Sequence, residues 1–358
     1  MLLYSSNNKS FIGLFKLLII SLFLTIVLTI EQVSSSNGDG SVVFSNCLYK
    51  CRRDNCSNVK HKKTKENVTA DDINDSSVDF YDRQPLYLRL LGWDCDEECK
   101  YDCMWFTIHV FVYTYGYEVP QFYGKWPFIR ILGLQEPASV LASILNLLAN
   151  FYMFKKLNKC LKSKRKNPFR TLWYTLSLIS MNTWVWSAIF HAKETPFTER
   201  MDYFCAFGFV LFQFNSFFVR FFKVSRIPMS DLIIFSISTA CISYFVYHCY
   251  YLSSVSFDYG YNMKMNILFG AFNSICWIFW SIYNFYFKGL RHAWRCAFSV
   301  LIFDISMIFE IFDFSPIWWT LDSHAAWHFS TIIIPFYWYQ FLIDDINYIH
   351  FKHSYSKI

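Results

Sequence analysis

Two histidines separated by three residues, His324 and His328, open the last apolar stretch of this 358-residue chain. Positions four residues apart on an α-helix lie on nearly the same face, about 6 Å apart along the axis. Both imidazoles can therefore reach one point, which suits a metal ion. A third histidine, His191, ends an earlier apolar stretch, with Ser187 one helical turn before it and Asp202 at the start of the next stretch. Together these five side chains predict a hydrolytic metal site.

The residue types define the chemistry of that site. Three neutral imidazoles on Zn²⁺ leave one tetrahedral position for a water molecule, whose pKa falls to about 7. We therefore expect Zn²⁺ to be bound by His191, His324 and His328. A nearby carboxylate can accept the proton of the water, so Asp202 is the candidate general base. Ser187 can donate a hydrogen bond to a developing oxyanion or orient Asp202. The predicted reaction is hydrolysis of an acyl bond.

Each of these elements also has a structural interpretation. An isolated H-x-x-x-H pair is a weak motif, and a histidine at a helix end is usually an interfacial polar residue. A serine in an apolar helix is usually a packing residue. Ionisable residues inside a membrane nevertheless tend to be functional. Four acidic residues could either orient the imidazoles or lie at the membrane interface: Asp304, Glu310, Asp313 and Asp322.

The composition is that of a membrane protein. Hydrophobic residues make up 54% of the chain and aromatic residues 22%, whereas charged residues account for only 17%. The formal net charge is +6, but the positive residues cluster beside apolar stretches, where they set membrane topology. We therefore expect no nucleic-acid partner.

Seven apolar segments from residue 137 onward are long enough to span a membrane as helices. They cover residues 137–154, 172–191, 202–222, 230–252, 266–287, 294–314 and 324–344. We expect an all-α membrane protein with a seven-transmembrane-helix bundle. In this interpretation the hydrolase domain covers residues 137–344, and a cytosolic tail covers residues 345–358.

Charge asymmetry predicts the orientation of the helices. The connection after the first helix contains eight Lys and Arg residues between positions 155 and 170, whereas the next contains only Lys193 and Arg200. By the positive-inside rule the former is cytosolic, so odd-numbered helices run from lumen to cytosol. All five candidate site residues then fall at luminal helix ends, although the histidines were not used to set the topology.

The first 36 residues are typical of a signal peptide. Lys9 and Lys16 precede an apolar run over residues 17–30, which gives way to the polar, small-residue segment EQVSSSNGDG. We expect cleavage around residues 34–36, with an uncleaved signal anchor as the alternative. Either arrangement sends the following segment into the lumen.

The predicted luminal segment, residues 37–136, carries half of the twelve cysteines: Cys47, Cys51, Cys56, Cys95, Cys99 and Cys103. In an oxidising lumen these predict three disulfides. The two C-x3-C spacings favour two short helices cross-linked through those pairs, which leaves Cys56 with Cys95. The sequence leaves the connectivity open, and a zinc knuckle is the alternative. Glycosylation sequons at Asn55, Asn67 and Asn74 fit the same compartment.

Longer strings resemble a known family. The pattern S-x-x-x-H, a following aspartate and a late H-x-x-x-H across seven helices is similar to the CREST superfamily of membrane hydrolases, which includes alkaline ceramidases and adiponectin-receptor-like proteins. Three strings resemble the post-GPI-attachment phospholipases in particular: GLQEPASVLASILN (133–146), WSAIFHAKETPFTERMDYF (186–204) and DFSPIWWTLDSHAAWHFSTIIIP (313–335). The signal peptide and the cysteine-bearing string WDCDEECKYDCMW fit the same family.

The resemblance implies remodelling of glycosylphosphatidylinositol (GPI) anchors after their attachment to protein. The reaction would be a phospholipase A2-type removal of the unsaturated sn-2 acyl chain. The resemblance implies the roles given above: Zn²⁺ on His191, His324 and His328, water activation by Asp202, and oxyanion stabilisation by Ser187. The implied partners are GPI-anchored proteins and membrane lipid. The implied location is the Golgi membrane, or alternatively the endoplasmic reticulum membrane, with a luminal active site.

Other functional classes stay open from the sequence. A ceramidase-like amidase would share the site but should lack the long luminal segment. A receptor would signal on ligand binding with little turnover, and a trafficking factor for GPI-anchored proteins would tolerate loss of the site residues. Transport is disfavoured, because no paired broken-helix segments are evident.

Overall fold

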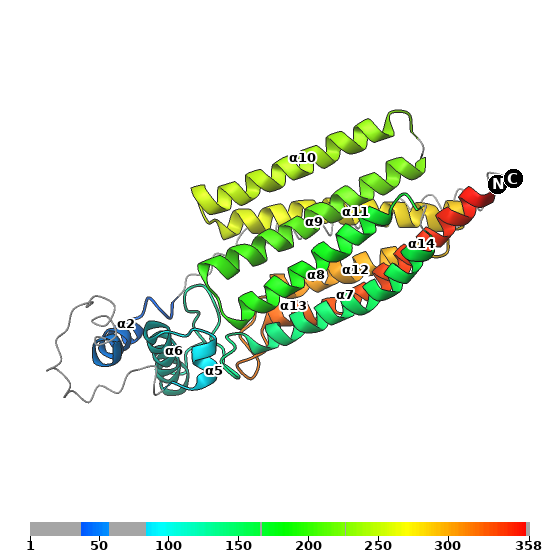
Figure 1. Ribbon diagram of the computed structural model, residues 1–358. Coiled ribbons are helices and arrows are strands. Elements are labelled where there is room, and N and C mark those ends of the chain that lie inside the picture. Colours follow the sequence, from blue (N-terminus) through cyan, green and yellow to red (C-terminus); the bar gives the residue numbers. More distant parts are fainter. Residues whose placement is uncertain (1–36, 57–83, 165–166, 226, 356–358) are drawn as a thin grey trace, which may run out of the picture. The chain divides into compact units, whose positions relative to one another are not determined.

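The computed structural model describes residues 37–56, 84–164, 167–225 and 227–355, which form helices joined by turns (Figure 1). The predicted signal peptide and the sequons at Asn67 and Asn74 lie outside these residues. The chain divides into two compact units. The disulfide unit comprises Gln32–Pro137 and Phe314–Asp322, and the bundle comprises Ala138–Asp313 and Ser323–Ile358. The sequence had assigned the short loop Phe314–Asp322 to the bundle region.

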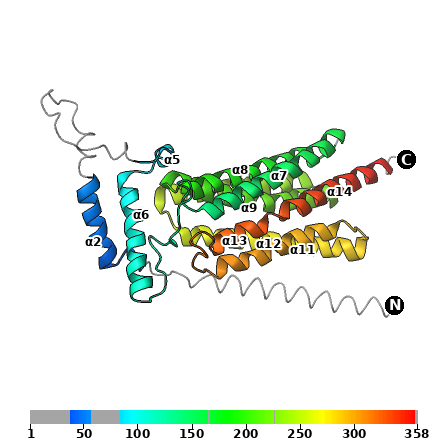
Figure 2. The same ribbon diagram turned by 90° about the horizontal axis from the view of Figure 1, so that it is seen from below.

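Two antiparallel helices form the centre of the disulfide unit. They are α2 (Val42–Cys51) and α6 (Cys95–Ile108), which lie side by side in Figure 2. The side chain of Ser41 caps α2, and Asp94 and Glu97 form a capping box at the start of α6. A short helix, α5 (Leu86–Leu90), and two π-helical turns, η1 (Arg52–Cys56) and η2 (His109–Thr114), complete the unit.

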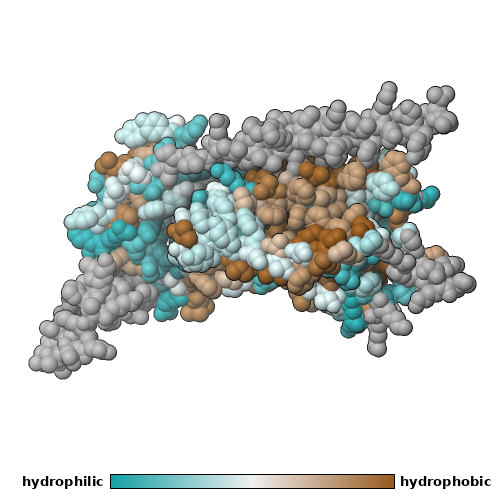
Figure 3. Space-filling model, turned by 90° about the horizontal axis from the view of Figure 1, so that it is seen from above, coloured by the Kyte–Doolittle hydropathy of each residue, from teal (hydrophilic) through white to brown (hydrophobic). Residues whose placement is uncertain are grey.

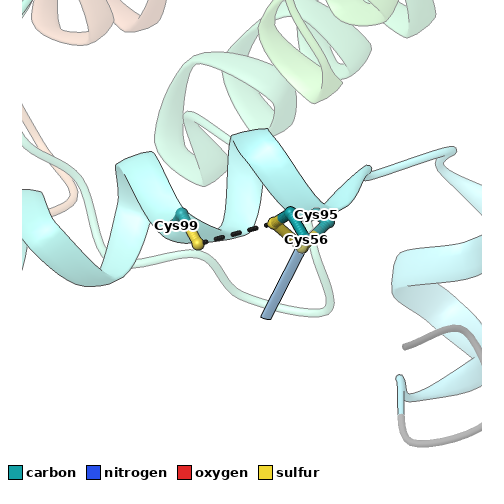
Figure 4. A group of neighbouring side chains, drawn as sticks. All are labelled: Cys56, Cys95 and Cys99. Carbon is teal, nitrogen blue, oxygen red and sulfur yellow. Dashed lines mark hydrogen bonds between the residues drawn. A yellow bond between two sulfur atoms is a disulfide. The ribbon is translucent and has the colours of Figure 1, made fainter. Parts of the chain in front are cut away.

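The six cysteines of this unit form three disulfides: Cys47–Cys103, Cys51–Cys99 and Cys56–Cys95. The predicted cross-linking of the two C-x3-C pairs is therefore confirmed. Cysteines four residues apart lie on one face of a helix, so antiparallel helices pair them in reverse order. Figure 4 shows where Cys99 approaches the Cys56–Cys95 disulfide. Because every one of these sulfur atoms is already in a disulfide, the structure favours the disulfide framework over a zinc knuckle.

The bundle consists mostly of long helices (Figure 1). In chain order they are α7 (Pro137–Ser163), α8 (Arg170–Ala192), α9 (Pro196–Ser225), α10 (Ser230–Tyr250) with the π-helical turn η3 (Tyr251–Val255), α11 (Tyr259–Lys288), α12 (Ala293–Ile311), α13 (Ser323–Thr331) and α14 (Ile334–Tyr355). Apolar side chains gather over the bundle on the face drawn in Figure 3. On α10, for example, Leu232, Phe235 and Ile242 are exposed, as expected of side chains that face lipid.

Four of the described helices are long and apolar enough to cross a membrane, judged by length and composition. They are α7, α9, α10 continued by η3, and α11. The chain is therefore a mostly helical membrane protein with an N-terminal disulfide-bonded segment. The count of seven membrane-spanning helices stays a prediction.

The single helix predicted over residues 324–344 is wrong. The structure has two helices there, because α13 ends at Thr331 and α14 begins at Ile334. Pro335 explains the break: its nitrogen carries no hydrogen, and its ring clashes with the carbonyl group four residues earlier, which is that of Thr331. As a result, both histidines of the H-x-x-x-H motif lie on a short helix of their own.

Aromatic packing and one buried ion pair hold the helices of the bundle together. Trp277 is fully buried, and the rings of Phe217 and Trp338 pack edge-on against it, each with a centroid distance of 5.1 Å. Arg220 of α9 forms a bidentate pair with Asp345 of α14, with N–O distances of 2.8 and 2.5 Å. Both side chains are buried, and a buried charge requires such a partner.

Candidate metal centre

Three histidines from distant parts of the sequence meet in the bundle. Their ring centroids are 5.1 Å apart for His191 and His324, 5.2 Å for His191 and His328, and 4.5 Å for His324 and His328. One ring nitrogen from each lies within 4.8 Å of the other two. The geometry predicted from helix spacing and topology is therefore present, and metal binding itself stays a prediction.

The helices α8 and α13 position these rings. His191 lies in the last turn of α8, while His324 and His328 lie one turn apart on the same face of α13. The Nε2 atoms of His324 and His328 are 2.9 Å apart, so they face a common point. His191 and His328 are buried, and His324 is partly exposed.

The three imidazoles fit a small divalent cation. His328 Nδ1 is buried and has no hydrogen-bond partner among the described residues, and an unpaired buried nitrogen costs free energy. The nitrogens of His324 and His328 that face each other can share either a proton or a metal ion. A set of three imidazoles with an open fourth position is the ligand set of several catalytic zinc sites.

A carboxylate on α12 orients one of the imidazoles. Glu310 Oε2 lies 2.9 Å from His324 Nδ1. This contact fixes the proton on Nδ1 and leaves Nε2 available to a metal, as carboxylate partners of metal-bound histidines do. Glu310 is one of the four acidic residues considered from the sequence, and its contact with His324 supports the orienting role. Asp304 instead accepts a hydrogen bond of 2.8 Å from Ser274.

The other two acidic residues flank α13. Asp313 Oδ1 accepts a long hydrogen bond of 3.4 Å from Ser323 Oγ, and Ser323 is the first residue of α13. Asp322 is buried in the loop that precedes this helix.

The helix α7 anchors α13 through a buried asparagine that sequence reasoning missed. Asn146 Nδ2 donates to the backbone carbonyl of His328 at 2.7 Å, and Asn146 Oδ1 accepts from Thr331 Oγ1 at 3.3 Å. Ser143 and Asn150 are buried on the same side of α7. Polar residues spaced three or four apart in an apolar helix indicate a buried polar face, and this signal was available in the sequence.

Ser187 lies on α8 one turn before His191, on the same face of the helix. It is buried, and its hydroxyl is 3.0 Å from that of Ser143 on α7. This hydrogen bond holds Ser187 on the side of α8 that carries His191. Its predicted role as an oxyanion donor stays a prediction.

Asp202 lies in the second turn of α9, which packs along α8. The two helices are joined by a short turn in which Thr195 and Thr198 exchange backbone-to-hydroxyl hydrogen bonds of 2.8 and 3.1 Å. Asp202 is half-buried, and it is not among the side chains whose possible ligand atoms lie within 4.8 Å of one another. Its predicted role as a base stays a prediction.

Aromatic rings surround the histidines. The ring of Trp184 packs edge-on against His328 at 5.3 Å, and Trp327 lies 4.7 Å from the same imidazole. The ring of Phe190 is 5.0 Å from that of His191. Such a shell limits the access of water and strengthens electrostatic interactions at the site.

The sequence is similar to known proteins over most of its length. The model of the Per1-like family matches residues 85–346. The GPI-specific phospholipase A2-like PGAP3 of Danio rerio is 38% identical over 312 residues, which cover 87% of this chain and 91% of the relative. Its human counterpart is 35% identical, with coverages of 88% and 91%. The post-GPI attachment to proteins factor 3 of Drosophila melanogaster is 34% identical, with coverages of 86% and 88%. No solved structure matches the chain.

Proposed function

Because this chain belongs to the Per1-like family, we propose that it remodels the lipid of GPI anchors. The reaction is a phospholipase A2-type hydrolysis that removes the unsaturated sn-2 acyl chain of a GPI anchor already attached to protein. The relatives' names support this reaction class. The observation that carries the proposal for this chain is the convergence of His191, His324 and His328 on one point of an apolar bundle.

We assign Zn²⁺ to the three histidines. Bound there, it would lower the pKa of a water molecule and polarise an ester carbonyl group. Glu310 contacts His324 Nδ1, so Nε2 would be free to bind the ion, and Asn146 fixes the backbone at His328. The donor set supports zinc over calcium or magnesium, which prefer oxygen ligands.

Two side chains carry out the proton transfer and stabilise the developing charge. Asp202 accepts a proton from the attacking water as the water adds to the sn-2 ester carbonyl. Ser187 donates a hydrogen bond to the carbonyl oxygen as that oxygen gains charge. The ester C–O bond then breaks, and the departing sn-2 oxygen takes up the proton that Asp202 received. The products are a free fatty acid and a lyso-GPI anchor.

A lipid substrate suits a site built inside apolar helices. The distribution of Lys and Arg along the sequence supports a luminal position for the site, with the disulfide unit in the same oxidising compartment. We assign the protein to the Golgi membrane, with the endoplasmic reticulum membrane as the alternative. A cleaved signal peptide and N-glycosylation belong to the same proposal.

The proposal is tested by complementation of cells that lack the anchor-remodelling phospholipase. The sn-2 chain of a GPI-anchored reporter is read by mass spectrometry for the wild type, His324→Ala and Asp202→Asn. His109→Ala is the matched control, because His109 is exposed and lies in the disulfide unit. We expect the wild type and the control to restore remodelling, and both site variants to fail at equal expression.

The opposite result has a defined meaning. If His324→Ala and Asp202→Asn restore remodelling as well as the wild type does, the protein is not a metal hydrolase that uses these residues. A non-catalytic role in the handling of GPI-anchored proteins would then account better for the family membership. A wild-type protein that hydrolyses ceramide but not the anchor lipid would instead favour a ceramidase-like amidase.

A further inference from the structure

Three tight turns of the disulfide unit carry large apolar residues in a left-handed backbone conformation. Each turn is closed by an isolated bridge, and their φ angles are +52° at Tyr123, +54° at Leu132 and +51° at Trp318. A bulky residue pays about 1–2 kcal/mol for this conformation, which glycine and asparagine adopt more easily. The residue types at these turns are therefore not explained by the local backbone.

Core packing does not explain two of these residues either. Leu132 is 73% exposed and Trp318 is 80% exposed. An apolar side chain that stays in water contributes little to the stability of the unit. Neither the backbone conformation nor core packing explains why these two residues are large and apolar. Contact with a surface outside the unit would explain it.

The two turns belong to one surface. The backbone N–H of Ile129, just before the first turn, donates to the carbonyl of Trp319 in the second turn at 2.8 Å. The helix α5 lies against the first turn, because a Cβ atom at Gly133 would come within 3.1 Å of Leu88 Cδ2. We call the exposed apolar side chains of the two turns the turn patch: Ile131, Leu132, Ile317 and Trp318.

The chain itself limits what can cover the turn patch. Leu132 lies five residues before the start of α7, one of the helices that is apolar and long enough to cross a membrane. Five residues extend at most about 17 Å, so the turn stays close to the level at which α7 enters the membrane. Trp318 lies five residues before the start of α13. The hydrogen bond between Ile129 and Trp319 also keeps the second turn beside the first, so both turns are within reach of the lipid surface.

The chemistry of the turn patch also fits lipid. Tryptophan is enriched at the boundary between the acyl chains and the headgroups, and leucine and isoleucine enter the apolar layer beneath it. We propose that the turn patch inserts into the membrane interface at the end where α7 begins, with Leu132 and Trp318 as its deepest side chains. This holds the loop Phe314–Asp322, which leads into the histidine-bearing helix α13, at the lipid surface. The inference does not rest on the proposed hydrolase activity.

Site-specific fluorescence in the full-length protein tests the inference. An environment-sensitive fluorescent amino acid is placed at position 132 or 318, and the protein is reconstituted in phosphatidylcholine nanodiscs. Positions 42 and 49 are matched controls, because Val42 and Tyr49 are 72% and 70% exposed on α2 of the same unit. We expect a nitroxide attached to the lipid acyl chain to quench the two patch positions strongly and the two controls weakly. A water-soluble nitroxide should give the opposite order.

Two results would overturn the inference. Quenching of positions 132 and 318 by the water-soluble nitroxide alone would show that the patch stays in water. Protection of both positions from both nitroxides would show that a protein surface, such as a second copy of the chain, covers them. Neither readout depends on whether the protein hydrolyses a lipid.

A second variant separates insertion from folding. The double variant Leu132→Asn/Trp318→Asn removes the apolar side chains and keeps residues that tolerate positive φ. With the fluorophore at position 317, we expect quenching by the lipid nitroxide to fall while the thermal unfolding transition is retained or rises. Unchanged quenching in this correctly folded variant would contradict the role of the two turn residues.

Discussion

The disulfide unit and the bundle are ordered by different means. In the disulfide unit, three covalent bonds join two short capped helices that have only a small core to share. In the bundle, the six cysteines that the structure describes are free, and the helices are held by aromatic packing and a few buried polar contacts. A disulfide stabilises the fold whether or not its surroundings are polar. A polar side chain buried in an apolar bundle, by contrast, costs free energy if it loses its hydrogen-bond partner. The candidate metal centre depends on contacts of the second kind.

The largest effect on stability is expected from breaking the buried ion pair of the bundle. Arg220→Leu leaves Asp345 as a buried charge without its main partner, which should lower the free energy of unfolding by about 3–5 kcal/mol. The matched control is Arg295→Leu, because Arg295 pairs with Asp344 at the same distance of 2.5 Å but is about one-third exposed.

Denaturant unfolding of the full-length protein in detergent measures both variants. The double variant Arg220→Leu/Asp345→Leu should recover much of the lost stability, because it leaves no unpaired charge. A double variant as unstable as Arg220→Leu alone would show that the pair is not the source of the effect.

A somewhat smaller effect is expected from removing one disulfide. Cys47→Ser/Cys103→Ser opens a long loop of the disulfide unit and should destabilise it by about 2–4 kcal/mol. The control is Cys160→Ser, because Cys160 is a free cysteine of the bundle. Limited proteolysis of the disulfide unit measures the effect, and equal protease resistance of the two variants would contradict the contrast between the units.

Much of the disulfide unit could be predicted from the sequence, because helical spacing limits which cysteines can pair. A C-x3-C spacing places two cysteines on one helix face, and two such pairs can cross-link only through those faces. The break before Pro335 was also signalled by a single residue, but it was missed because the flanking residues form one continuous apolar run. The inclusion of the loop Phe314–Asp322 in the disulfide unit has no local signal, because it depends on a contact such as that between Ile129 and Trp319.

The contact between Glu310 and His324 predicts that the candidate metal centre depends on one carboxylate. Glu310→Ala should lower the affinity for Zn²⁺ by about 10–100-fold, because His324 loses the carboxylate that orients it. Asp304→Ala is the matched control on the same helix, since Asp304 bonds to Ser274. Metal competition with a chelator measures the affinity, and equal losses in the two variants would argue against a specific role for Glu310.

The convergence of the three histidines could be predicted, whereas their supports could not. Helix spacing and charge asymmetry placed His191, His324 and His328 at one depth without any knowledge of packing. The choice of Glu310 among four acidic residues requires the rotation of α12 relative to α13, which spacing within one helix does not give. Asn146 was missed because a polar residue in an apolar helix marks a buried face without naming its partner.

The smallest effect is expected at the surface of the disulfide unit. Asp96 accepts a hydrogen bond from Arg52, which lowers the pKa of Asp96 below its ordinary value of about 3.9. Both side chains are more than one-third exposed, so Asp96→Asn should change the free energy of unfolding by only about 0–1 kcal/mol at neutral pH.

The lowered pKa of Asp96 predicts how the stability difference between the wild type and Asp96→Asn changes with pH. A carboxylate with a lowered folded-state pKa stabilises the protein above its unfolded-state pKa, and this contribution disappears as the pH falls through the folded-state pKa. The difference between the wild type and Asp96→Asn should therefore vanish in acid. A difference that grows as the pH falls would contradict the pairing with Arg52.

The zinc content of the purified full-length protein tests the central claim most directly. Elemental mass spectrometry should find one Zn²⁺ per chain in the wild type and in His109→Ala, and little in His328→Ala. Removal of the metal from the wild type should abolish release of the sn-2 fatty acid from a GPI substrate, and added Zn²⁺ should restore it. A wild-type protein that releases the fatty acid at full rate without bound metal would contradict the account.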